Sequence, residues 1–369
     1  MGRDGETVVS TRVVLLANNV DELGGAQKVV QVLAAGFASR GYDVTLVGVE
    51  PVGERTAHVS ASYQVERLLE VSYPKDSGPE LDALRVGAVK KLQTILEAGD
   101  PGVIISAQVW AMEHALDCDL TDWKTIGQFH SSIEAAVFNK DLARILQAYR
   151  DADAFLALTD IDALRFTQSG LNNARAMPNP LAQWPETVAN PDSKVITYLG
   201  RLSAEKAPMT LVQAWRIVCG QGQLDDWSLN IIGSGPHDVQ IEAAIADLPR
   251  VRLLAPVSDP YATLQNTGIL AVPSLVEGLP LAVMEALASG VPVVASDCSA
   301  GVRELLDNGA CGILVNRGDA ADLARGLCEL AQNDQLRAQM AAHGRTHIEA
   351  YRLDRVLDQW EKLFADVQR

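Results

Sequence analysis

Several features that would identify a common class of protein are absent from the sequence. The cysteines are odd in number and scattered, without a Cys-x-x-Cys pair, which favours buried free thiols in a reducing compartment over disulfides or a zinc site. They are Cys118, Cys219, Cys298, Cys311 and Cys328. The net charge of −16 argues against a nucleic-acid partner, which usually requires a basic face, and gives no support for strong attraction to anionic lipid.

Signals for export or membrane insertion are also absent. The segment 1–10, MGRDGETVVS, is charged and polar and does not resemble the apolar core of a signal peptide. Glu6 does not fit an N-myristoylation signal, and no apolar run reaches the ~20 residues of a transmembrane helix. We therefore expect a cytoplasmic protein, and weak peripheral contact with the inner face of the membrane stays open.

No motif of a common hydrolase, NTPase or metalloenzyme is present. The sequence has no G-x-S-x-G elbow, no P-loop and no H-E-x-x-H, and its six histidines are dispersed. The Asp-x-Asp copies that begin at Asp117 and Asp151 flank predicted element boundaries, and we expect no bound metal. IIGSGPHD has Asp238 where a dinucleotide fingerprint needs its third glycine, which argues against a nicotinamide enzyme.

The pattern that is present alternates between apolar strands and amphipathic helices, and 369 residues suit two α/β domains better than one. The apolar run 11–18 predicts a strand buried on both faces, followed by a helix at 26–39 and a strand at 43–49. Gly24 and Gly25 precede this helix, where free N–H groups favour an anion such as phosphate. A purely steric role for the two glycines is the alternative.

The remainder of the first half continues this alternation. Strands are expected at 61–69, 102–110, 124–132 and 154–158, and helices at 84–97, 140–152 and 160–168, the last with Thr159 as its N-cap. His130 lies at the end of a strand, so a ligand role and a structural role are both open. The helix 84–97 is locally basic, through Arg85, Lys90 and Lys91. We expect a solvated face there, with docking on an acidic acceptor or a membrane surface as the alternative.

A proline-rich stretch separates this half from a second set of strands and helices. Residues 172–194 contain four prolines and show little periodicity, which is typical of an interdomain linker. Strands are then expected at 193–200, 226–233, 250–257, 269–272, 291–295 and 312–315, with helices between them and at 320–332. We expect one domain at 1–182, a linker at 183–193 and a second domain at 194–351, with a ligand cleft between the domains.

Two glutamates mark residues 272–296, VPSLVEGLPLAVMEALASGVPVVAS, as a candidate ligand site. Glu277 follows a predicted strand, where open α/β sheets bind ligands. Glu285 lies in a helix that is apolar on most sides, and a buried carboxylate needs partners, which a ligand would supply. In RLSAEKAP, Arg201 and Lys206 follow another strand, and a guanidinium together with an ammonium would suit a diphosphate. Two surface cations are the alternative for that pair.

Four segments, in this order, resemble motifs of the family-four (GT4) retaining glycosyltransferases of the GT-B fold. GGAQKVV resembles that family's GGA-E-R-V opening, and GRLSAEKAP resembles its G-R-L-x-x-E-K loop, with E-K-A-P where many members have E-K-G. VEGLPLAVMEA resembles its E-x7-E block, and GILVNRGD its G-x-L-V-x-P-G-D segment. The resemblance implies two Rossmann-like α/β domains facing each other across a cleft, with the C-terminal helix 352–369 crossing back onto the first domain.

The resemblance also implies roles for individual residues. Arg201 and Lys206 would bind the diphosphate and stabilise its charge as it leaves. Glu277 would contact the donor sugar, and Glu285 would hold the ribose hydroxyls. His130 would lie near the donor sugar. Further donor contacts are expected from Gly24, Gly25, Gly233, Gly278, Leu279, Pro280 and Leu281.

We therefore predict a metal-independent, retaining glycosyltransferase that uses a nucleotide sugar. It would move a hexose or N-acetylhexosamine from a UDP-sugar to a glycan, a lipid-linked sugar or a small molecule bound mainly by the first domain. Cell-surface polysaccharide or glycoconjugate synthesis would be its context, and no cofactor is expected beside the nucleotide-sugar co-substrate. A nucleotide-sugar epimerase and a non-catalytic sugar-nucleotide binder of the same fold are the alternatives.

Overall fold

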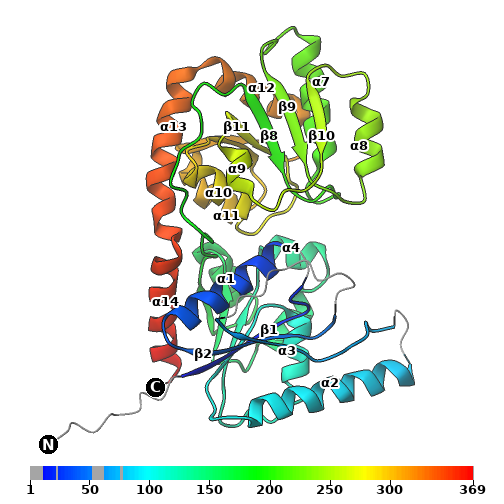
Figure 1. The fold of residues 1–369 in the computed structure, drawn as a ribbon, viewed down its shortest axis with the longest axis vertical. Helices are drawn as coiled ribbons and strands as arrows, with labels where there is room; N and C mark the ends of the chain where they lie inside the picture. The colour runs from blue at the N-terminus through cyan, green and yellow to red at the C-terminus, as the bar shows by residue number, and fades with distance from the viewer. Residues whose placement is uncertain (1–10, 22–23, 52–61, 75–77, 369) are drawn as a thin grey trace, which may run out of the picture. The chain divides into compact units, whose positions relative to one another are not determined.

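The computed structural model describes residues 11–21, 24–51, 62–74 and 78–368 (Figure 1). The segment 1–10, which bears on export, and the start of the strand expected at 61–69 lie outside these ranges. The chain divides into two compact units, each with its own sheet and core. The first comprises Met1–Ile133, Asn139–Ala182 and Leu353–Arg369, and the second comprises Glu134–Phe138 and Gln183–Arg352.

The first unit is built on a parallel sheet. Its described strands form a seven-stranded sheet in the order β3-β2-β1-β4-β5-β6-β7, and all neighbours are parallel. The strands are β1 Arg12–Ala17, β2 Asp43–Gly48, β3 Gln64–Arg67, β4 Val103–Ser106, β5 Lys124–Gln128, β6 Ala154–Ala157 and β7 Ala174–Ala176. The helices are α1 Gly25–Ser39, α2 Pro79–Glu97, α3 Val109–Ala115, α5 Leu142–Ala148, α6 Asp160–Gln168 and α14 Leu353–Val367, while α4 Ile133–Phe138 begins at the unit boundary. β1 is buried throughout, as the apolar run RVVLLA predicts for a strand covered on both faces.

The last helix of the chain belongs to the core of the first unit. α14 packs on α1, and a Cβ added to Gly36 would lie 2.9 Å from the side chain of Leu357, so glycine allows the close approach. Phe37 packs against Trp360 and Phe364 at ring-centroid distances of 5.6 and 5.3 Å, and all three rings are buried. The chain therefore returns to its first unit for its final fifteen-residue helix (Figure 1).

The second unit repeats the architecture. Its described strands form a six-stranded parallel sheet in the order β10-β9-β8-β11-β12-β13. The strands are β8 Val195–Leu199, β9 Ser228–Ile232, β10 Val251–Leu254, β11 Ile269–Val272, β12 Val293–Ser296 and β13 Gly312–Val315. The helices are α7 Pro208–Gly220, α8 Asp238–Ile245, α9 Pro260–Leu264, α10 Leu281–Ala288, α11 Ala300–Leu305, α12 Ala320–Gln332 and α13 Asp334–His347, with short 3-10 turns at Asp307–Gly309 and Ile348–Tyr351. Among the described helices of both units, none is long and apolar enough to cross a membrane.

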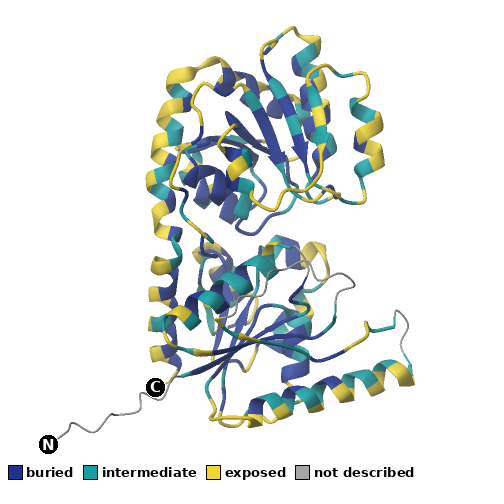
Figure 2. Cartoon of the chain, in the orientation of Figure 1, coloured by how far each residue is buried: buried dark blue, intermediate teal, exposed yellow. Residues whose placement is uncertain are grey.

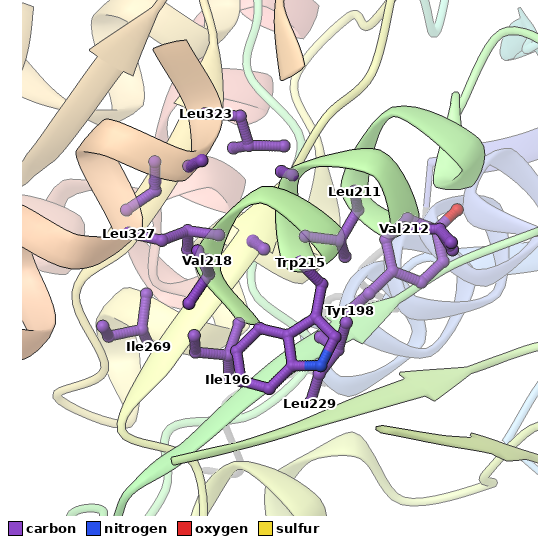
Figure 3. Close-up of a cluster of buried hydrophobic side chains, with 14 of the residues drawn as sticks. Ile196, Tyr198, Leu211, Val212, Trp215, Val218, Leu229, Ile269, Leu323 and Leu327 are labelled. Atoms are coloured by element: carbon purple, nitrogen blue, oxygen red, sulfur yellow. The ribbon is translucent and has the colours of Figure 1, made fainter. Parts of the chain in front are cut away.

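The core of the second unit forms around Trp215 of α7. Its indole N–H donates to the carbonyl of Pro249 at 3.0 Å, so the buried ring keeps its one polar group satisfied. Side chains of the strands and of α12 surround it (Figure 3); they include Ile196, Tyr198, Leu229, Ile269, Leu323 and Leu327. In both units the central strands are buried, whereas the edge strands β3, β7 and β10 are partly exposed (Figure 2). This packing fixes the carboxyl ends of β8 and β11.

The predicted parallel α/β architecture is confirmed, and individual elements differ at their ends. Thr159 caps α6 as predicted, because its side chain accepts a hydrogen bond from the Asp162 N–H. The strand predicted at 102–110 is wrong beyond Ser106, since α3 begins at Val109 and a short apolar run does not separate strand from helix. The proline-rich stretch 172–194 contains β7, whose three residues are too few to show a period and which lies before the linker predicted at 183–193; α4 is not predicted at all.

Candidate active site

Two loops of the second unit meet at the carboxyl edge of its sheet. One follows β8 and carries Arg201 to Lys206; the other follows the neighbouring strand β11 and carries Ser274 to Gly278. The N–H groups of Leu275 and Val276 both donate to the carbonyl of Glu205, at 2.8 and 3.4 Å. These hydrogen bonds join segments that are about 70 residues apart in the chain, at the edge where open α/β sheets bind ligands.

Lys206 and Glu277 form an ion pair at this junction. The ammonium Nζ lies 2.8 Å from both Oε1 and Oε2 of Glu277, and the Ser274 hydroxyl donates to Oε1 at 2.7 Å. The Glu277 side chain is 7% exposed and that of Lys206 is 32% exposed. A nearly buried carboxylate is thus satisfied by one cation and one hydroxyl, as its desolvation requires. The structure brings together two of the residues singled out in the sequence.

Arg201 occupies the start of the same loop, with its backbone firmly held. The Tyr198 hydroxyl donates to the Arg201 carbonyl at 2.7 Å, and burial, together with the charge of Glu277, raises the pKa of Tyr198 and keeps this donor protonated. The next residue, Leu202, donates its N–H to the Ser234 carbonyl at 2.9 Å. The Arg201 side chain itself is exposed, and its charge acts on the Glu205 carboxylate. A cation on a fixed backbone therefore lies at the ligand edge of the sheet.

Gly233 and Gly235 have a steric role in positioning this loop. A Cβ on Gly233 would lie 1.9 Å from the Gly200 carbonyl oxygen, and one on Gly235 would lie 2.5 Å from that of Leu202. Only glycine at both positions lets the loop after β9 run against the loop after β8. The sequence groups Gly233 with the donor contacts, and the structure gives it a packing role beside the cationic loop.

Glu285 lies inside α10, in the next segment of the chain. It is 6% exposed in a helix whose residues from Val283 to Ala288 are all buried, as the apolar pattern predicts. Its charge acts on Tyr261 of α9, whose pKa is raised first by burial and second by this carboxylate. Glu285 is therefore a carboxylate in an apolar helix that directly follows the loop of Glu277.

The turn between Glu277 and α10 is tightly packed. Gly278, Leu279 and Pro280 are buried, and Leu281 opens the helix. Pro280 has no N–H to donate, and its carbonyl accepts the first helical hydrogen bonds from Val283 and Met284, so its backbone groups shape the turn.

A second layer of residues that the sequence does not single out holds this turn. The Ser299 hydroxyl donates to the Gly278 carbonyl at 3.3 Å, and a Cβ on Gly301 would lie 2.0 Å from the same oxygen. Arg317 donates to the Leu275 carbonyl at 3.3 Å from the loop after β13. Burial raises the pKa of the Cys298 thiol to about 12, with the charge of Glu277 adding to the effect, so the thiol stays neutral. Only the position of Arg317, in the segment GILVNRGD, carries a sequence signal for this layer.

His130 of the first unit follows β5. Its Nδ1 lies 3.0 Å from the Asn179 side-chain oxygen, and because that oxygen only accepts, Nδ1 carries the proton. Burial lowers the pKa of His130 to about 4, so the ring is neutral at pH 7 and Nε2 is a hydrogen-bond acceptor. Nε2 is buried and has no partner among the described residues. A buried polar atom of this kind is typical of a ligand contact or a bound water.

Gly24 and Gly25 lie at the start of α1, in the same unit. Gly24 is the N-cap in an extended conformation with a φ of −145°, no side chain caps the helix, and its first turn has no acidic residue. A Cβ on Gly24 would meet only the flexible side chain of Gln27. Backbone strain therefore does not require these glycines, and the uncapped amides fit an anion.

Two of the three cations on the basic helix α2 have partners within the first unit. Arg85 pairs with Asp117 at 2.8 Å, and Lys91 donates to the Arg67 carbonyl at 2.5 Å. Both contacts favour the structural reading of this basic face. Within the described ranges, no group of three or more His, Cys, Asp or Glu side chains is arranged to hold a metal ion.

Comparisons with known proteins agree with this arrangement. The protein-family model described as Glycosyltransferase Family 4 matches residues 23–181. The protein-family model described as Glycosyl transferases group 1 matches residues 193–333. An uncharacterized glycosyltransferase of Haemophilus influenzae is 27% identical over 354 residues, covering 93% of this chain and 97% of that protein. The amylovoran biosynthesis glycosyltransferase AmsD of Erwinia amylovora is 22% identical over 374 residues, covering 95% of this chain and 99% of that protein.

Solved structures show the same fold. TarM of S. aureus superposes with a TM-score of 0.82 at 14% identity, covering 96% of this chain and 99% of that one. Anabaena HepE, solved in complex with UDP-glucose, superposes with a TM-score of 0.80 at 17% identity, covering 96% and 100%. The two family models match the two halves of the chain in order, and the gap between them, residues 182–192, lies within the proline-rich stretch. The chain belongs to the family-four glycosyltransferases of the GT-B fold.

Proposed function

We propose that this glycosyltransferase transfers a hexose or N-acetylhexosamine from a UDP-sugar to a carbohydrate-containing acceptor during polysaccharide synthesis. The observation that carries the proposal is the Lys206–Glu277 pair at the ligand edge of the second sheet. Relatives named for amylovoran and for capsular polysaccharide biosynthesis support the context. Two solved structures of the same fold support the choice of a uridine nucleotide. They are HepE in complex with UDP-glucose and the pneumococcal O-GlcNAc transferase GtfA in complex with UDP and GlcNAc.

The ion pair suits a donor that carries both a diphosphate and hydroxyl groups. The Lys206 ammonium, which pairs with Glu277, can bind a diphosphate instead. The higher charge of a diphosphate makes it the stronger partner for Lys206. Glu277 then needs other donors because it is nearly buried, and sugar hydroxyls supply them. The exposed Arg201, on the same loop, adds a second cation with a planar fork for the phosphates.

The neighbouring helix is assigned to the nucleoside. Glu285, which is 6% exposed in α10, would hold the ribose hydroxyls. Backbone groups of Gly278, Leu279 and Leu281 would contact the sugar and phosphates at the start of α10. From the first unit, we assign the uncapped amides at Gly24 and Gly25 and the acceptor atom Nε2 of His130 to the donor as well.

The proposed reaction is a group transfer with retention and without a metal. The bond between the sugar C1 and the β-phosphate oxygen breaks, and its electron pair leaves with UDP. The acceptor hydroxyl oxygen forms the new bond to C1, and its proton passes to an oxygen of the departing diphosphate. Lys206 and Arg201 stabilise the negative charge that develops on UDP, which is the largest contribution expected of the protein.

The experiment that tests this proposal follows the fate of a UDP-sugar by NMR, with and without a glycan acceptor. A transferase hydrolyses UDP-glucose slowly to glucose and UDP in the absence of acceptor and leaves the unreacted donor unchanged. Conversion of UDP-glucose to another UDP-hexose would instead identify an epimerase. Binding without any turnover in the presence of oligosaccharide mixtures would identify a non-catalytic binder.

A further inference from the structure

A second polar and aromatic cluster lies at the carboxyl edge of the first unit's sheet. Segments that follow the adjacent strands β2, β1 and β4 form it. The Asn18 N–H donates to the Gln108 side-chain oxygen at 2.7 Å, and the Glu50 N–H donates to the Asn18 carbonyl at 2.8 Å. The Glu50 carboxylate in turn accepts the Tyr73 N–H at 2.9 Å. These contacts hold three strand ends and Tyr73 in one fixed arrangement, at the edge where such sheets bind ligands.

Tyr73 and Trp110 form a corner of two rings within this cluster. Their centroids lie 5.1 Å apart and the ring planes meet at 69°, so the rings do not stack face to face on each other. Both residues are half-buried. The aromatic residues of the α1–α14 core, such as Phe37 and Phe364, are by contrast fully covered. The corner therefore presents aromatic surface beside the ligand edge while its backbone is fixed by hydrogen bonds.

His114 fixes the orientation of Tyr73. Its Nδ1 lies 2.9 Å from the Trp110 carbonyl, so Nδ1 carries the proton, and burial lowers the pKa of His114 and keeps the ring neutral. Nε2 is then an acceptor for the Tyr73 hydroxyl at 2.8 Å. The Tyr73 hydroxyl is therefore occupied by a hydrogen bond within the protein, and the aromatic ring is the part of Tyr73 that can contact a ligand.

Asn18 adds a polar atom at the same edge. Its Oδ1 is buried and has no partner within the described part of the chain, although its backbone N–H and carbonyl are both used. A buried amide oxygen without a partner costs free energy that a hydroxyl donor would recover. Aromatic surface and a hydrogen-bond acceptor are thus anchored to each other through Gln108, two residues before Trp110.

We propose that the corner formed by Tyr73 and Trp110, with Asn18, is an acceptor subsite that binds a pyranose ring. A pyranose has C–H-rich faces, which pack on aromatic rings, and a rim of hydroxyls, which bind acceptors such as Asn18 Oδ1. This inference rests on the proposed glycosyl transfer and narrows the acceptor to a carbohydrate ring. An open-chain polyol acceptor would use the hydroxyl contact with Asn18 but has no ring face to pack on the corner.

The test uses simple sugars that need no knowledge of the natural acceptor. Binding of the methyl pyranosides of glucose, galactose, mannose and N-acetylglucosamine to the full chain is measured by saturation-transfer difference NMR. Sorbitol, which has hydroxyls but no ring face, is the matched control ligand. The wild type is expected to bind at least one pyranoside saturably, with the largest transfer to the C–H protons of one face, and not to bind sorbitol.

Variants of the corner make the test specific. Trp110→Leu is expected to weaken pyranoside binding about tenfold, equivalent to ~1.4 kcal/mol, while Trp110→Phe keeps a flat ring and stays within about threefold of the wild type. The unfolding temperature and UDP-glucose affinity of each variant show that it is folded. The proposal would be overturned if no pyranoside bound saturably, or if the wild type and Trp110→Leu bound the pyranosides equally well. Failure of the proposed function would give a different result, because the wild type would then bind no UDP-sugar.

Discussion

Lys206 Nζ lies 2.8 Å from both carboxylate oxygens of Glu277, a residue 71 positions further along the chain. Removing only the ammonium leaves a nearly buried carboxylate with Ser274 as its remaining side-chain donor among the described contacts. We expect Lys206→Ala to lower the free energy of unfolding by about 1–3 kcal/mol, less than for a fully buried pair because Lys206 is partly exposed. Urea denaturation measures this change.

The double variant Lys206→Ala/Glu277→Gln distinguishes the effect of the lost ion pair on stability from the effect of the lost side-chain packing. Because it removes both charges, it should be more stable than Lys206→Ala alone. Lys194→Ala, in an exposed pair with Asp226, is the matched control and should change stability by less than about 0.5 kcal/mol. If the single variant is at least as stable as the double variant, the two side chains are not coupled.

Ala207, the residue after Lys206, has an unfavourable backbone conformation. Its φ of 45° and ψ of 46° are left-handed, and it stands where many family members have glycine. We expect Ala207→Gly to raise the free energy of unfolding by up to about 1 kcal/mol, because the relief of left-handed strain exceeds the added freedom of the unfolded chain. Ala204→Gly in the same loop lacks a positive φ and should not stabilise. A loss of stability in Ala207→Gly would contradict this reading.

Gly301 controls the position of the turn that follows Glu277. A Cβ there would lie 2.0 Å from the Gly278 carbonyl oxygen, a backbone atom that cannot move without the turn. Gly301→Ala should therefore weaken UDP-sugar binding about tenfold or more and lower stability by about 1–3 kcal/mol. Gly220→Ala, where a Cβ meets nothing within 4 Å, is the control. Equal donor affinity in Gly301→Ala and the wild type would show that the turn does not position the donor.

His130 should make stability depend on pH in acid. Its folded pKa of about 4 lies below the unfolded value of 6.5, so the folded state favours the neutral ring. The stabilisation is present above pH 6.5 and is lost as pH falls toward 4, by at most roughly 3 kcal/mol. His130→Asn should reduce the slope of unfolding free energy against pH in this window, since His114 still contributes in the same direction. An unchanged slope, or an NMR titration of His130 near pH 6.5, would refute the assignment.

The sequence predicted the parts of the fold that repeat a strong local signal. The apolar runs at β1, β11 and β12 mark buried parallel strands, and the helix at α12 has clear periodicity and a cap at Asp319. Short elements were harder because they contain too few residues to show a period. β7 has three residues, and the run through Val109 fits strand or helix until tertiary packing decides.

The residues of the candidate site also differ in whether the sequence predicts them. Carboxylates and cations at strand ends are recognisable in a single sequence, so the sequence alone predicts Lys206 and Glu277 as site residues. A residue that acts through a backbone carbonyl, such as Ser299, has no distinctive local pattern, and Arg317 stands out only through its position in the segment GILVNRGD. The corner of Tyr73 and Trp110 is assembled from segments 37 positions apart, and only the sheet order brings those segments together.

Calorimetric titration with UDP-glucose, UDP-galactose, UDP-N-acetylglucosamine, GDP-mannose and ADP-glucose tests the central claim most directly. At least one UDP-sugar is expected to bind more tightly than the GDP- and ADP-sugars. Lys206→Ala and Glu277→Gln are each expected to weaken that binding about tenfold or more, while Lys194→Ala is not. Absence of binding by every UDP-sugar, or unchanged affinity in both site variants, would contradict it.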